Sequence, residues 1–141
     1  MILLDTNVVS EPLKLSGDAG VLTWIDAQII ETLYLSTISL AELRFGIAAL
    51  PAGKRRDTLH ASLEQRILPL FVGRILSFDL AASEAYAVLL ARARAQGKAI
   101  APADGYIAAT ATTHGLIVAT RDTGPFEAAG LTVINPWNTQ H

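Results

Sequence analysis

The chain contains no cysteine, which excludes disulfide bonds, thiolate-bound zinc and cysteine nucleophiles together. Any metal ion must therefore be held by oxygen or imidazole ligands. Long hydrophobic runs are also missing. No apolar stretch reaches the roughly 20 residues of a membrane-spanning helix, and residues 1–5 carry no basic segment ahead of an apolar one. We therefore expect a soluble, cytoplasmic protein with no membrane partner.

Charge of either sign is scarce. Charged residues make up 17% of the chain and hydrophobic residues 51%, a balance typical of a well-packed globule. The formal net charge of −2 provides no overall attraction to nucleic acid, so a polyanionic substrate would have to meet a local basic patch or bound cations. A length of 141 residues fits one domain, and neither a repeat nor a linker divides residues 1–141.

Short apolar runs alternate with longer segments of helical character, which predicts an α/β fold. Five runs have the composition of strands: residues 2–4, 33–35, 75–78, 116–119 and 131–134. Strands that are apolar on both faces and separated by helices usually form a parallel sheet covered on each side. We expect a central parallel sheet of about five strands flanked by helices.

Three helices are predicted from their periodicity, at residues 54–70, 79–96 and 102–114. The first has Leu59, Leu63 and Ile67 at successive i, i+4 positions, which makes it amphipathic. The second has an apolar stripe and a basic flank, formed by Tyr86, Leu89, Leu90 and Ala93 and by Arg92, Arg94 and Lys98.

Four acidic residues are candidates for a functional site, although each has a structural explanation when taken alone. Ser39 and Glu42 have the spacing of a helix capping box. Asp104 lies just inside a predicted helix start, where the helix dipole favours a carboxylate, and Asp122 follows a strand where loop or cap acids are common. Asp5 has the position of a turn residue after the first strand. These alternatives stay open for each acid by itself.

The predicted topology brings the four acids to the same end of the sheet. Asp5 closes the first strand, and Glu42 lies in the first turn of the helix after the second. Asp104 opens the helix that leads into the fourth strand, and Asp122 follows that strand. The carboxyl ends of parallel strands form the crevice where ligands bind. Crowded carboxylates repel one another unless a cation lies between them, and Mg²⁺ or Mn²⁺ accepts such ligands while leaving positions for phosphate oxygens. The chemistry therefore points to phosphodiesters.

The residues around the acids form four motifs, MILLDTN at 1–7, SLAELR at 39–44, ADGYIAATA at 103–111 and VATRD at 118–122. Together they resemble the signature of the PIN-domain toxins, and those of the VapC and FitB type in particular. The similarity runs from Met1 to Trp137, nearly the whole chain. Four motifs in order are far more specific than any single one.

The resemblance implies a PIN-like three-layer sandwich and a homodimer that cleaves RNA with Mg²⁺, for which Mn²⁺ substitutes. It implies metal ligation by Asp5, Asp104, Glu42 and Asp122, with Asp5 and Asp104 central. It also implies a small antitoxin whose C-terminal tail covers the catalytic groove, and which supplies the DNA contacts of the complex. The RNA target, the number of metals and the assembly stoichiometry do not follow from the sequence.

Five further residues are candidates for a supporting role. Thr6, Asn7 and Thr120 have side chains suited to orienting carboxylates or waters, although turn and cap chemistry explains them equally well. Arg44 and Arg121 lie near acids in the sequence and are suited to holding phosphate, with a plain surface role as the alternative.

Other charged and aromatic residues favour structural explanations. Basic groups at 54–56 and 92–98 are typical of solvated helix faces, although an RNA backbone is an alternative partner. Aromatic residues at helical spacing usually belong to the core, which is the interpretation we favour for Trp24, Phe45 and Tyr86, with a dimer or antitoxin surface as the alternative. The three histidines, His60, His114 and His141, lack the spacing of a shared metal site. No serine lies in the sequence pattern of a nucleophile elbow.

Three alternative functions fit the sequence less well. A receiver-like signalling module would need an early acidic pair and a late lysine, but Asp5 stands alone and no lysine follows Lys98. A dinucleotide-binding enzyme would need a glycine-rich turn after the first strand, where this chain has Asp-Thr-Asn. A catalytically silent PIN fold that only binds partners is disfavoured because all four acids are present.

Overall fold

The computed structural model describes residues 1–138 as an alternating α/β chain; His141 lies outside the described residues. The strands are β1 (Ile2–Leu4), β2 (Leu33–Ser36), β3 (Ile75–Leu76), β4 (Ile117–Ala119) and β5 (Val133–Ile134). The α-helices are α1 (Thr6–Val9), α2 (Ala19–Ala27), α3 (Thr37–Ala48), α4 (Lys54–Ser62), α5 (Leu80–Ala95), α6 (Pro102–Thr113) and α7 (Thr123–Ala128). Shorter helical turns are η1 (Glu11–Leu13), η2 (Ile30–Thr32), η3 (Leu63–Ile67) and η4 (Leu68–Phe71).

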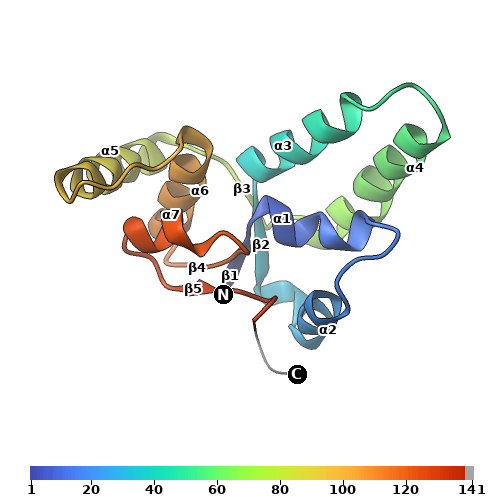
Figure 1. Ribbon diagram of the computed structural model, residues 1–141, viewed down its shortest axis with the longest axis horizontal. Helices are drawn as coiled ribbons and strands as arrows, with labels where there is room; N and C mark the ends of the chain where they lie inside the picture. Colours follow the sequence, from blue (N-terminus) through green and yellow to red (C-terminus); the bar gives the residue numbers. More distant parts are fainter. Residues whose placement is uncertain (139–141) are drawn as a thin grey trace.

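The strands form one five-stranded parallel sheet in the order β3-β2-β1-β4-β5. Helices α5, α6 and α7 lie on one side of the sheet, and α1, α3 and α4 lie on the other (Figure 1). The predicted parallel sheet between two helical layers is therefore confirmed.

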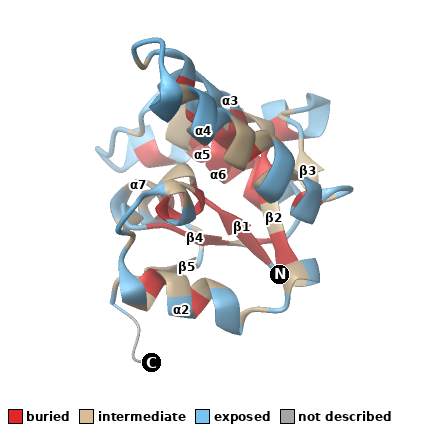
Figure 2. Cartoon of the chain, turned by 90° about the vertical axis from the view of Figure 1, so that its right-hand side faces the viewer, coloured by how far each residue is buried: buried red, intermediate tan, exposed pale blue. Residues whose placement is uncertain are grey.

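Alternation along the strands builds the two halves of the core. Ile2 and Leu4 pack with residues of α1, α2 and α3 on one face of β1. Leu3, between them, packs with residues of α5, α6 and α7 on the other face, because successive side chains of a strand point in opposite directions. Strands β1, β2 and β4 are accordingly mostly buried and the edge strands β3 and β5 are half-buried, while the outer faces of α3 and α4 are exposed (Figure 2).

The predicted helix at 54–70 is wrong in its second half. The α-helix ends at Ser62, and a π-helical turn and a 3₁₀ turn follow as η3 and η4. Pro69, in the first turn of η4, cannot donate a backbone hydrogen bond, so a regular helix cannot run through it. Leu63 is still buried, and Leu59 and Ile67 pack against the same half of the core, as the predicted stripe requires.

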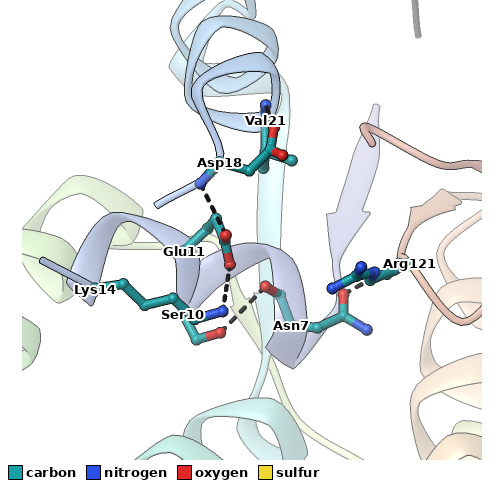
Figure 3. Close-up of polar contacts among 7 residues, drawn as sticks. All are labelled: Asn7, Ser10, Glu11, Lys14, Asp18, Val21 and Arg121. Atoms are coloured by element: carbon teal, nitrogen blue, oxygen red, sulfur yellow. Dashed lines mark hydrogen bonds and ion pairs between the residues drawn. The ribbon is translucent and has the colours of Figure 1, made fainter. Parts of the chain in front are cut away.

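A buried acid outside the four candidates joins η1 to α2. Glu11 is 5% exposed, accepts a hydrogen bond from the backbone N–H of Asp18 at 3.0 Å and forms an ion pair with Lys14 at 2.8 Å (Figure 3). Gly17 passes so close that an added Cβ would lie 2.6 Å from the Glu11 carbonyl oxygen. These contacts explain Glu11 as a structural residue.

The strand order creates a switch point between β1 and β4. After β1, the chain adds β2 and β3 next to one edge of β1. It then crosses over and adds β4 and β5 next to the other edge of β1. The connections after β1 and β4 therefore leave the sheet in opposite directions, and a crevice opens between them at the carboxyl ends of the strands. No helix within residues 1–138 is long and apolar enough to cross a membrane.

Candidate metal-binding active site

Asp5 lies at the switch point, between the end of β1 and the start of α1. It is only 6% exposed. Both of its carboxylate oxygens accept a hydrogen bond: Oδ1 from the backbone N–H of Thr6 and Oδ2 from the hydroxyl of Thr120, each at 2.8 Å. The Thr120 hydroxyl comes from the end of β4, so these contacts join the two strands that flank the crevice.

Burial raises the pKa of Asp5 to about 6, because a charged carboxylate loses hydration inside the protein. The hydrogen bonds from Thr120 and Thr6 act in the opposite direction, since they stabilise the charged form. The negative charges of Asp104 and Glu42 raise the pKa further. Asp5 is therefore a buried carboxylate that faces other carboxylates.

Glu42 lies in the second turn of α3, not in the first turn as expected. Its Oε1 accepts a hydrogen bond from the Thr6 hydroxyl at 2.7 Å. The capping-box explanation is wrong, because the helix begins earlier: Ser36 is the N-cap and accepts from the backbone N–H of Ser39 at 3.0 Å. Glu42 is thus free of helix capping and is held by the residue that follows Asp5.

Asp104 lies in the first turn of α6 and is half-buried. Burial raises its pKa, and the charges of Asp122 and Glu42 raise it further. The electrostatic contacts of Asp104 therefore link three of the acids to one another, and Asp5 is coupled to the same group.

Asp122 occupies the N-cap position of α7, but its side chain makes no capping hydrogen bond. The cap explanation for this carboxylate is therefore wrong. Its backbone N–H donates to the Thr120 hydroxyl oxygen at 3.0 Å, and its side chain is exposed. The loop after β4 is thus anchored through Asp122's backbone, which leaves the carboxylate available.

We refer to Asp5, Glu42, Asp104 and Asp122 as the acid site. None of these acids forms an ion pair within residues 1–138, where the ion pairs are Lys14–Glu11 and Arg44–Glu64. No three acidic or histidine side chains in this part of the chain form a ready-made metal-ligand cluster. The donor chemistry nevertheless fits a hard divalent cation, since it consists of carboxylates that repel one another. Glu42 and Asp122 are exposed, so their side chains have room to move toward a cation.

The supporting residues divide into two groups. Thr6 and Thr120 each donate a hydroxyl proton to one acid, and Asn7 contacts Thr120 at 3.3 Å. The arginines are directed elsewhere. Arg44 forms a two-point ion pair with Glu64, at 2.7 and 3.1 Å, and the Arg121 guanidinium lies over the ring of Trp137, 5.2 Å from its centroid.

The aromatic predictions have different outcomes. Trp24 is buried in the core as predicted. Tyr86 is half-buried and stacks on Tyr106 with ring centroids 5.0 Å apart. Phe45 is 74% exposed on the outer face of α3, so its assignment to the core is wrong. Helical spacing alone does not reveal which face of α3 meets the sheet.

A groove beside the acid site was not foreseen from the sequence. It runs between α3, α4 and the segment around η1, has a volume of about 960 Å³, and contains Glu42 among its lining residues. Its walls are mainly apolar, with Leu13, Leu43, Ile47 and Leu59, and its cations are Lys14, Lys54 and Arg55. We call it the α3–α4 groove. Its residues come from three separate segments, so no local pattern announces it.

Known proteins resemble this chain over nearly its whole length. The PIN domain family matches residues 2–131. The VapC ribonuclease Y4jK of Sinorhizobium fredii is 64% identical over 137 residues, covering 97% of this chain and 98% of that protein. The Toxin FitB of Neisseria gonorrhoeae is 56% identical over 138 residues, covering 98% and 99%.

Solved structures give the same result. The crystal structure of FitAcB from Neisseria gonorrhoeae contains a chain with a TM-score of 0.95 and 56% identity, covering 99% of this chain and 100% of that one. A structure of FitAB bound to a DNA fragment has a TM-score of 0.96 and 54% identity, covering 100% and 99%. The similarity thus extends over nearly the whole chain, and the chain belongs to the PIN domain family, among the proteins of the VapC and FitB type.

Proposed function

We propose that this chain is a metal-dependent endoribonuclease that acts as the toxin of a toxin-antitoxin pair. The observation that carries the proposal is the burial of Asp5 among other carboxylates, none of which is paired with a cationic side chain of residues 1–138. The names of the relatives, a VapC ribonuclease and a FitB toxin, support the same activity.

In this proposal Asp5 and Asp104 are the central ligands of Mg²⁺ or Mn²⁺, and Glu42 and Asp122 complete the site directly or through waters. When bound, such a cation lowers the pKa of a water and stabilises the charge that develops on the phosphate oxygens. Thr6 and Thr120 keep Glu42 and Asp5 oriented by donating hydrogen bonds to one oxygen of each. The phosphodiester bond of RNA is then cleaved by hydrolysis.

The test is RNA cleavage by the antitoxin-free protein in Mg²⁺ or Mn²⁺. We expect Asp5→Asn and Asp104→Asn each to lower the cleavage rate by about a hundredfold or more, because each removes a charged ligand. A chelator should abolish cleavage by the unsubstituted chain. Asp26→Asn, which removes a carboxylate of α2 outside the acid site, is the matched control.

Cleavage that survives both the substitutions and the chelator would contradict the proposal. A folded protein that binds its antitoxin but cleaves nothing in either metal would instead identify a catalytically silent PIN fold.

We also propose an antitoxin as partner, with its C-terminal tail in the α3–α4 groove and its remaining part in contact with DNA. Support comes from the apolar walls of the groove, from its basic residues and from Glu42, which places one end of the groove at the acid site. A homodimer is part of the same proposal. Exposed apolar residues such as Phe45 on α3 and Val88 on α5 are suited to contact a second copy.

A further inference from the structure

The Asn7 side chain bridges two segments that are more than a hundred residues apart in sequence. Its amide nitrogen donates to the Thr120 hydroxyl oxygen at 3.3 Å, and its amide oxygen accepts from the backbone N–H of Arg121 at 3.2 Å. Asn7 belongs to α1, and its side chain points toward the segment that carries Arg121 (Figure 3). Asn7 thus ties the start of α1 to the loop between Thr120 and Asp122.

The direction of these hydrogen bonds follows from the backbone. The Arg121 N–H is only a donor, so the Asn7 atom facing it must be the oxygen, and the nitrogen then faces Thr120. The Thr120 hydroxyl oxygen also accepts from the backbone N–H of Asp122 at 3.0 Å. Both of its acceptor positions are therefore filled, and one proton remains to be donated.

That proton has one strong acceptor. The Asp5 carboxylate oxygen Oδ2 lies 2.8 Å from the Thr120 hydroxyl, whereas the alternative, the Asp122 carbonyl, lies at 3.5 Å and is uncharged. Hydrogen bonds to a charged acceptor are the shorter and stronger ones. The orientation of Asn7 thus makes the Thr120 hydroxyl donate to Oδ2 of Asp5. The lone pairs of the carboxylate that accept no hydrogen bond remain available to a cation.

We propose that Asn7 is a positioning residue, which fixes the direction of the hydrogen bonds at Asp5 and holds the loop carrying Asp122 against the start of α1. The proposal rests on the proposed function in one respect, that Asp5 and Asp122 act together on a divalent cation. A role in folding alone would change the stability of the chain but would leave the Mn²⁺ affinity of the folded protein unchanged.

The first experiment measures Mn²⁺ binding directly by calorimetry. Asn7→Ala should weaken binding by about tenfold to a hundredfold, the usual effect of losing an outer partner of a metal ligand. Asn135→Ala is the matched control, because the Asn135 side chain is also half-buried and also accepts from a backbone N–H, that of Trp137 at 2.9 Å. Mn²⁺ affinities of the two variants within twofold of each other would overturn the proposal.

A second variant separates hydrogen-bond direction from charge. Asn7→Asp keeps an acceptor for the Arg121 N–H but removes the donor to Thr120, so the Thr120 proton gains a competing carboxylate acceptor. We expect Mn²⁺ binding to weaken even though a negative charge has been added beside the acid site. If Asn7→Asp binds Mn²⁺ as tightly as the unsubstituted chain, or more tightly, the added charge determines Mn²⁺ affinity and the direction of the hydrogen bonds does not. That result would overturn the proposal.

The third measurement does not need a metal. In the presence of a chelator, the backbone N–H groups of Arg121 and Asp122 should exchange with solvent about tenfold faster in Asn7→Ala than in Asn135→Ala, because the loop has lost its anchor. If the unsubstituted chain binds no Mn²⁺, the proposed function fails while amide exchange still decides whether Asn7 anchors the loop.

Substitutions of Thr120 test the same hydrogen bonds should Asn7→Ala fail to fold. Thr120→Ser retains the hydroxyl and should keep Mn²⁺ affinity, whereas Thr120→Val should lose it. Equal affinities of the two Thr120 variants would contradict the proposal.

Discussion

Asp5 keeps its proton in the folded, metal-free protein at pH values where the unfolded chain has already lost it. Burial raises its pKa from 3.8 to about 6, a difference equivalent to about 3 kcal/mol. Between these two values the folded state binds more protons than the unfolded state, so the free energy of unfolding falls as pH rises from 4 to 6. Above pH 6 the whole contribution is lost.

Asp5→Asn should remove this pH dependence, because the amide does not ionise. In chelator, we expect the stability of Asp5→Asn relative to the unsubstituted chain to increase by up to about 3 kcal/mol between pH 4 and pH 7. Urea denaturation at several pH values measures the difference. Adding Mn²⁺ at pH 7 should stabilise the unsubstituted chain only. A stability difference that stays constant from pH 4 to pH 7 would show that folding does not raise the pKa of Asp5.

The acids and three candidate partners, Thr6, Asn7 and Thr120, could be named from the sequence, but which acid each partner contacts could not. Asp5, Asp104 and Asp122 follow or precede recognisable strands, and parallel strands bring their ends to one edge. The Thr6–Glu42 contact joins residues 36 positions apart and depends on how α3 crosses the sheet. The local pattern predicted a capping box for Glu42, but α3 begins earlier, with Ser36 as its N-cap.

Among the helices, α5 and α6 pack closely because Gly105 has no side chain. An added Cβ would lie 2.8 Å from Cε2 of Tyr86 and 3.0 Å from Leu90. The Tyr86 ring cannot easily retreat, since it stacks on Tyr106 and meets Phe78 edge-on. A side chain at position 105 would therefore displace Tyr86 or push α5 and α6 apart.

Gly105→Ala should destabilise the protein by about 1–3 kcal/mol, the usual cost of overpacking a well-filled contact. Gly46→Ala is a matched control in α3, where an added Cβ has no neighbour within 4 Å, and it should stabilise by about 0.5–1 kcal/mol through better helix propensity. Thermal denaturation of both variants tests the opposite signs. Equal shifts in the same direction would mean that α5 and α6 are not held at this distance.

Element type was more predictable than element length. The strands and the helices at 79–96 and 102–114 follow from periodicity, and glycines with positive φ end both of these helices, Gly97 at 74° and Gly115 at 65°. In the segment at 54–70, the predicted apolar stripe is present, but the α-helix gives way to π-helical and 3₁₀ turns. The stripe depends on which residues are buried, whereas the backbone type depends on Pro69, which cannot donate a backbone hydrogen bond. Phe45 was misassigned for a related reason: periodicity gives spacing on α3 but not the face that meets the sheet.

At the scale of the whole molecule, the net charge is negative, but positive charge gathers at the α3–α4 groove. The chain carries a formal charge of −2, yet the rim of the α3–α4 groove holds Lys54 and Arg55, neither of which forms an ion pair within residues 1–138. Lys14, the third cation of the groove, is paired with Glu11. A partner tail that enters the groove should therefore bring acidic residues to Lys54 and Arg55 and apolar residues to the walls.

Reversing the rim charges should slow association with the antitoxin. We expect the double variant Lys54→Glu, Arg55→Glu to reduce the association rate constant by about tenfold at low salt, because complementary charges steer the encounter. The difference should shrink in about 0.5 M salt, which screens exposed charges over a few ångströms. The matched control is Arg92→Glu, Arg94→Glu on α5, which changes the net charge by the same amount outside the groove. If both double variants slow association equally, electrostatic steering of the antitoxin depends on net charge alone. That result would contradict the assignment of the α3–α4 groove as the antitoxin site.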